Sequence, residues 1–108
     1  MRTATNKRIV LTTAGSQTEA RKLARALVQR KLAACVNIVP GVESIYRWQG
    51  QIESSQEWLL VVKASETKVK AAGDLIRKMH SYDLPECLVL EIESGSKEYL
   101  KWMDDCLK

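Results

Sequence analysis

The sequence lacks long apolar runs. None of its 108 residues belongs to an apolar stretch approaching the roughly 18 residues that cross a bilayer, so we expect no membrane insertion. The short apolar run at residues 9–11 is too brief for the core of a signal peptide. From these absences we expect a cytoplasmic protein.

Paired metal-binding or redox cysteines are also missing. The three cysteines, Cys35, Cys87 and Cys106, are widely spaced and form no C-x-x-C motif, which argues against a zinc ribbon, a thioredoxin-type site and a metal-chaperone loop. We expect reduced thiols. The single histidine, His80, cannot complete a four-ligand structural metal site with one cysteine.

Signatures of nucleic-acid binding and of catalysis are absent as well. The net charge of +4 arises from 17 basic residues interleaved with 13 carboxylates, which is typical of a solvated surface. No RNP, KH or helix-turn-helix pattern occurs, so we expect no nucleic-acid partner. Cys35 and His80 could form a nucleophile–base pair, but neither has a local orienting carboxylate or glycine elbow. We therefore expect no catalytic residues, no organic cofactor and no enzymatic activity.

What the sequence does contain is the composition of one soluble domain. Apolar residues make up 45% of the chain and charged residues 28%. At this length we expect a single domain over residues 1–108, with residues 1–7 flexible.

The first half of the chain predicts a strand, a helix and a long hairpin. A β-branched strand at residues 8–14 precedes a helix at 16–32, where Ser16 and Glu19 form a capping box and satisfy each other's backbone N–H groups. A strand at 34–45 is expected to bend or bulge at Pro40–Gly41, because proline cannot donate to a ladder. Gln49–Gly50 then forms the turn into a strand at 51–64.

The second half repeats the pattern. Ser65 can cap a helix whose apolar stripe includes Val69, Ala72 and Ile76, followed by a loop at 80–86 and a strand at 87–93. Ser96 caps a short C-terminal helix. The order predicts an α+β, ferredoxin-like split βαβ fold, with an antiparallel sheet, both main helices on one face and a long hairpin between the second and third strands.

Such a sheet leaves one face uncovered. We expect Trp48, Trp58, Val61 and Val89 to form an exposed apolar patch there, and a patch of this size favours association. The long hairpin edge also needs pairing or protection. Both features predict an oligomer.

Several spaced motifs then resemble the CutA divalent-cation tolerance family. They cover most of residues 8–107 and are KLAACVNIVPG, S-x-Y-x-W-x-G-x-I-E, VVK, H-x-Y-x-x-P-E and Y-L-x-W. The resemblance implies a ferredoxin-like fold, a homotrimer built through the long hairpins, and a role in tolerance of copper and other divalent metal ions. It also implies kinship in shape with the trimeric PII-type signalling proteins.

Carried over by position, the resemblance makes Cys35 and His80 the candidate metal ligands, with Glu57 a further possibility. A thiolate and an imidazole suit copper or zinc, and so few ligands imply weak binding. This chain departs from some relatives by carrying Thr12 and Met79 where those have cysteine and histidine. Ser81 replaces the usual proline after the histidine. Cys35 can instead be a small buried residue. His80 can instead be a loop residue after a helix C-terminus, where the dipole favours a cation.

A small-ligand binding or signalling module is the alternative function. The cleft between subunits would be lined by aromatic and charged side chains, namely Tyr46, Trp48, Lys63, Tyr82 and Glu86. Tyr46 and Trp48 can also be explained as anchors of the trimer interface.

Overall fold

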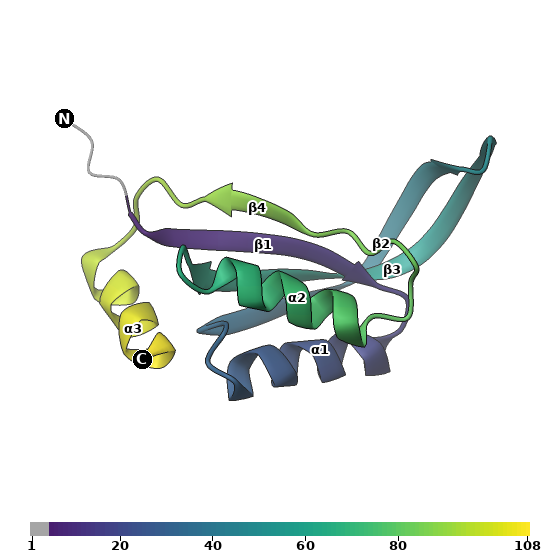
Figure 1. Cartoon of the computed structure of the whole chain (residues 1–108). Coiled ribbons are helices and arrows are strands. Elements are labelled where there is room, and N and C mark those ends of the chain that lie inside the picture. Colours follow the sequence, from purple (N-terminus) through teal and green to yellow (C-terminus); the bar gives the residue numbers. More distant parts are fainter. Residues whose placement is uncertain (1–4) are drawn as a thin grey trace.

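The structure is a computed structural model that describes residues 5–108, which form one four-stranded antiparallel sheet and three helices (Figure 1). The elements in chain order are β1 (Lys7–Ala14), α1 (Gln17–Gln29), β2 (Cys35–Trp48), β3 (Gln51–Ser65), α2 (Val69–Met79), β4 (Leu88–Glu91) and α3 (Lys97–Leu107). The sheet order β2-β3-β1-β4, with every pair antiparallel, confirms the predicted ferredoxin-like α+β fold.

The main core lies between the sheet and the pair α1 and α2, which cover the same face (Figure 1). Alternate residues of the central strands point into it, as expected from the two-residue period of a strand. The fully buried members with the largest side chains are Val10, Leu23, Leu27, Leu60, Val62 and Ile76. This confirms the predicted helical and strand periodicity.

Helix α1 ends earlier than predicted, at Gln29. Lys31 adopts a left-handed conformation with φ 58°, and the N–H groups of Leu32 and Ala33 both donate back to the Leu27 carbonyl. A left-handed residue just past a helix satisfies its last carbonyls, although glycine usually occupies that place. At the other end Ser16 caps the helix by accepting from the Glu19 N–H at 3.1 Å, as predicted.

The β2–β3 hairpin contains the predicted irregularity. Its register shifts between Val39 and Val42, where Pro40 interrupts the donor row and Gly41 has φ 73°. Gln49 and Gly50 both have positive φ and form the tight turn. Beyond the bulge the hairpin projects away from the helices as an arm (Figure 1).

The other face of the sheet is largely open, but its composition differs from the prediction. Trp58 packs against the main core on the helix side, because it pairs with buried Ala14. Val89 shares a face with Cys87, which also packs against that core. Val61 lies on the open face as predicted. The other apolar side chains there are Ile9, Leu11, Val39, Leu59, Leu88 and Leu90, as alternation from the core positions requires.

Helix α3 lies at the end of the sheet where β1 begins (Figure 1). Met103 and Leu107 pack there with Ala34 in a second small core, and Ser96 caps the helix as predicted. Buried Lys7 forms an ion pair with Asp104 at 2.7 Å.

Some predicted boundaries change. Of the segment expected to be flexible, residues 1–4 lie outside the described residues, and Lys7 already belongs to β1. Ser65 does not cap α2; it ends β3, and α2 begins after Lys68 without a side-chain cap. Strand β4 is only four residues long. Within residues 5–108, no helix is both long and apolar enough to cross a membrane.

Candidate functional site

Cys35 begins β2 on the open face of the sheet. It pairs directly with Lys63, whose neighbours Val62 and Ala64 point into the helix-covered core. The thiol is half-buried and forms no disulfide. Cys35 therefore lies outside the main core, but it is not fully exposed to solvent.

His80 lies at the opposite end of the same sheet. It follows the last residue of α2, and its Nε2 atom is 2.6 Å from the carbonyl oxygen of Thr13, near the end of β1. Thr13 pairs with Leu59, four residues along β3 from the partner of Cys35, a separation of about 13 Å along the strand. The structure therefore does not bring Cys35 and His80 together within one chain.

Glu57 is buried and receives a hydrogen bond from the loop that follows His80. The Tyr82 hydroxyl donates to Glu57 Oε2 at 2.8 Å, and only 7% of Glu57 is exposed. Burial, followed by this hydrogen bond, raises the pKa of Tyr82 well above its ordinary value, so the phenol stays a donor. Burial, followed by the nearby Glu57 charge, also raises the pKa of Glu86.

Glu19 also belongs to this region, although the sequence predicted it only as part of a helix cap. Its carboxylate accepts from the Ser81 N–H at 2.9 Å and from the Gly15 N–H at 3.4 Å, instead of the Ser16 N–H expected of a capping box. Burial raises the pKa of Glu19, but hydrogen bonding with the Ser81 side chain, followed by the bonds from the Ser81 and Gly15 N–H groups, outweighs it and holds the pKa below its ordinary value. The capping motif identified the residue, but not its partner 62 positions away.

Within one chain, only some of the residues predicted to line the inter-subunit cleft lie close together. Tyr46 lies on the hairpin arm, where its hydroxyl contacts Ser55 at 2.7 Å, and it is close enough to Tyr82 to affect that group electrostatically. Trp48 is at the tip of the arm beside the turn. Lys63 lies elsewhere, with its ammonium 3.4 Å from the Tyr99 hydroxyl on α3.

The predicted metal ligands do not assemble into a metal centre within this chain. Among residues 5–108 no group of three or more histidine, cysteine, aspartate or glutamate side chains could hold an ion. Both ring nitrogens of His80 are also engaged, since Nδ1 accepts from the Tyr82 N–H at 3.1 Å. The donor set therefore does not fit a copper ion bound by one chain alone.

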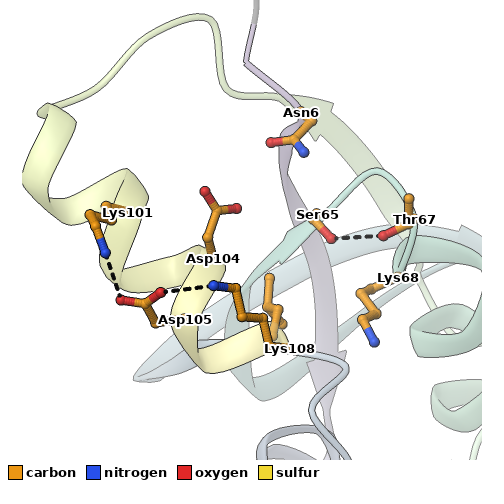
Figure 2. A pocket seen from close by; sticks show the side chains of 9 residues that line it. Asn6, Ser65, Thr67, Lys68, Lys101, Asp104, Asp105 and Lys108 are labelled. Carbon is orange, nitrogen blue, oxygen red and sulfur yellow. Dashed lines mark hydrogen bonds and ion pairs between the residues drawn. The ribbon is translucent and has the colours of Figure 1, made fainter.

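A separate polar pocket of about 410 Å³ lies between α3 and the β3–α2 connection (Figure 2). Its walls are Asn6, Ser65, Thr67, Lys68, Lys101, Asp104, Asp105, Leu107 and Lys108. The two carboxylates are neutralised by ion pairs, Asp104 with Lys7 and Asp105 with Lys101 and Lys108. None of the predicted site residues lines this pocket.

Comparison with known proteins assigns the family. Residues 8–106 match the model of the CutA1 divalent ion tolerance protein. The chain is 46% identical over 95 residues to the divalent-cation tolerance protein CutA of Thermus thermophilus, covering 88% of this chain and 92% of that protein. It is 42% identical over 95 residues to a chloroplastic CutA of Arabidopsis thaliana, where the match covers 88% of this chain but only about half, 52%, of that protein.

The fold comparison agrees and corrects one expectation. A solved structure of the CutA of Archaeoglobus fulgidus, described as a periplasmic divalent cation tolerance protein, matches with a TM-score of 0.92 and 38% identity, covering 94% of this chain and 99% of that one. The expected cytoplasmic location is contradicted by these relatives, one chloroplastic and one periplasmic. That expectation rested on the absence of long apolar runs in this sequence, which does not determine the compartment. By sequence and by fold, the chain belongs to the CutA1 divalent ion tolerance protein family.

Proposed function

We propose that this protein acts as a homotrimer in tolerance to divalent metal ions, copper among them. The observation that supports assembly into a homotrimer is the open sheet face. Leu88, Leu90 and Val39 are 56%, 49% and 42% exposed there, whereas α1 and α2 bury the opposite face. A contiguous apolar surface of this kind is normally covered by association.

The hairpin arm supplies a second contact surface. Ile45 and Ile52, beyond the bulge, are 70% and 69% exposed, and Tyr46 and Trp48 beside them are also exposed. Exposed aromatic and branched side chains on an unpaired arm are typical of an interface. In a closed ring each arm would contact the next copy, which gives every subunit the same environment.

Copper binding in this proposal is weak and shared between subunits. Cys35 is a soft donor on the face that the trimer would bury, and Glu57 is a buried carboxylate at the base of the arm. Because the donors of one chain are dispersed, a neighbouring subunit must complete any site. The trimer is then a requirement for binding.

Light scattering on a sizing column tests the assembly. We expect the wild-type protein at micromolar concentration to have three times the chain mass, and Leu88→Glu to lower it. Val28→Glu is the matched control, since Val28 is 43% exposed on α1, away from the open face, and should leave the mass unchanged. A folded wild-type monomer would contradict the proposal.

Copper titration tests the metal. Binding should weaken in Cys35→Ser and persist in Cys106→Ser, because Cys106 lies on α3 and packs against the second small core. Equal affinity in the wild type and both variants would refute the role of Cys35.

Small-ligand binding of the PII type is the second candidate. It is favoured by the hydroxyl and carboxylate groups of Tyr46, Tyr82, Glu57 and Glu86 near the base of the arm, which suit a cationic ligand. A thermal-shift screen of organic amines should find one that raises the melting temperature of the wild type but not of Glu86→Gln. A screen without such an amine would argue against this candidate.

A further inference from the structure

His80 occupies a position where its side chain joins two distant segments. It is the C-cap of α2, with its backbone N–H donating to the Ile76 carbonyl at 2.9 Å. The ring then turns toward β1 and contacts Tyr82, with ring centroids 4.6 Å apart. The side chain is half-buried between these elements.

The two hydrogen bonds of the ring fix its tautomer. The Thr13 carbonyl oxygen can only accept, so Nε2 carries the proton in the 2.6 Å bond. The Tyr82 backbone N–H can only donate, so Nδ1 carries the lone pair in the 3.1 Å bond. The ring is therefore the neutral Nε2–H form, with each nitrogen matched to a backbone group of opposite character.

Metal ligation is incompatible with this arrangement. An imidazole binds a metal ion through the lone pair of an unprotonated nitrogen, and the only one here is directed at the Tyr82 N–H. Ligation through either nitrogen would break at least one hydrogen bond and leave a backbone group without its partner. An unsatisfied buried backbone group is costly, so the metal would have to offset that loss.

The neighbouring residues show what the histidine holds in place. Ser81 donates its N–H to Glu19 on α1, and the Tyr82 hydroxyl donates to Glu57 on β3. Tyr82 also fits directly over Gly15, where a Cβ atom would lie 2.9 Å from its hydroxyl oxygen. Three consecutive residues thus tie the loop after α2 to β1, α1 and β3.

We propose that His80 is a structural clamp, which holds the loop against β1 and positions Tyr82 on Glu57, and is not a metal ligand of this protein. A metal ion bound by the trimer is then held by other donors. This role of His80 rests on hydrogen bonds within one chain and requires neither the trimer nor copper binding.

The test uses the imidazole resonances of the untagged 108-residue chain, which contains a single histidine. Long-range ¹H–¹⁵N correlation spectra should show the neutral Nε2–H pattern, unchanged when zinc chloride is added as a diamagnetic probe. An Nδ1–H pattern, or a zinc-dependent shift of the Nδ1 resonance, would overturn the proposal. The tautomer is read even if the protein binds no metal at all.

His80→Gln provides the binding test, because its side-chain amide keeps a donor for the Thr13 carbonyl. We expect the dissociation constants for zinc and copper to stay within about twofold of wild type. We expect the Tyr82 resonances to shift, since the loop loses the Nδ1 acceptor. A loss of affinity of about tenfold or more with unchanged Tyr82 resonances would show that His80 is a ligand. Where the variant fails to fold, the wild-type spectra decide alone.

Discussion

Thr12 offers the most direct test of how this core is packed. The residue is fully buried in the middle of β1, on the face covered by the helices and opposite Leu60. Within residues 5–108 its hydroxyl oxygen is the buried side-chain polar atom that lacks a hydrogen-bond partner. Replacing Thr12 by valine exchanges that hydroxyl for a methyl group at nearly constant volume.

The expected change follows from the cost of an unsatisfied buried hydroxyl. Such a group costs about 1–3 kcal/mol, and the added methyl gains roughly 0.8 kcal/mol of burial if it fits without strain. We expect Thr12→Val to raise the free energy of unfolding by about 1–2 kcal/mol, allowing for imperfect fit. For a chain of this length each kcal/mol corresponds to about 4 °C in melting temperature.

Thermal and denaturant unfolding measure this change in the free energy of unfolding. The proteins are compared at equal concentration, because association changes apparent stability. Thr12→Ser is the matched control, since it keeps the hydroxyl and loses the methyl. We expect the stability order valine, threonine, serine. If the valine variant is less stable than wild type and the serine variant is not, the hydroxyl has a stabilising partner and the reasoning fails.

Three further predictions concern single hydrogen bonds or dihedral angles. Lys31→Gly should raise the free energy of unfolding by about 0.5–1 kcal/mol, because glycine adopts the left-handed conformation without the steric cost; calorimetry showing a loss would contradict this. Glu19→Gln should be less stable than wild type at neutral pH. Since the pKa of Glu19 is lowered from 4.5 on folding, its contribution is present above that pH and lost as the pH falls through the folded value. The free energies of unfolding of wild type and Glu19→Gln, measured by denaturant from neutral to acidic pH, should therefore converge as the pH falls. A difference between them that does not change with pH would exclude the Glu19 carboxylate as the source of the lost stability. Tyr82→Phe should cost about 1–3 kcal/mol by leaving the Glu57 carboxylate without its donor. Tyr99→Phe is its control, because that hydroxyl makes only an exposed 3.4 Å contact with Lys63; equal losses in the two variants would contradict the prediction.

The fold was predictable because its determinants are local. The alternation of β1 and β3, the apolar stripes of α1 and α2, and the caps at Ser16 and Ser96 each act within a few residues. Pro40–Gly41 identified the bulge for the same reason, since proline removes a donor wherever it lies. Family membership also followed from motifs spaced along the chain.

The face of the sheet on which an individual side chain lies was harder to predict from the sequence. Trp58 was expected on the open face, but its partner across the sheet is buried Ala14, which places it in the helix-covered core. A one-residue difference in register or a bulge reverses such an assignment, and sequence alone does not establish which strand positions face each other. The cellular compartment could not be predicted either, because amino-acid composition does not encode it.

The site depended most on tertiary structure. The sequence by itself determined that the chain has one histidine, few soft donors and a ferredoxin-like order of elements. Only the folded chain decided that Cys35 and His80 lie at opposite ends of the sheet and that both nitrogens of His80 bind backbone groups. Hydrogen bonds between residues 62 or 67 positions apart leave no periodic trace in a sequence, because they depend on where packing places two distant segments.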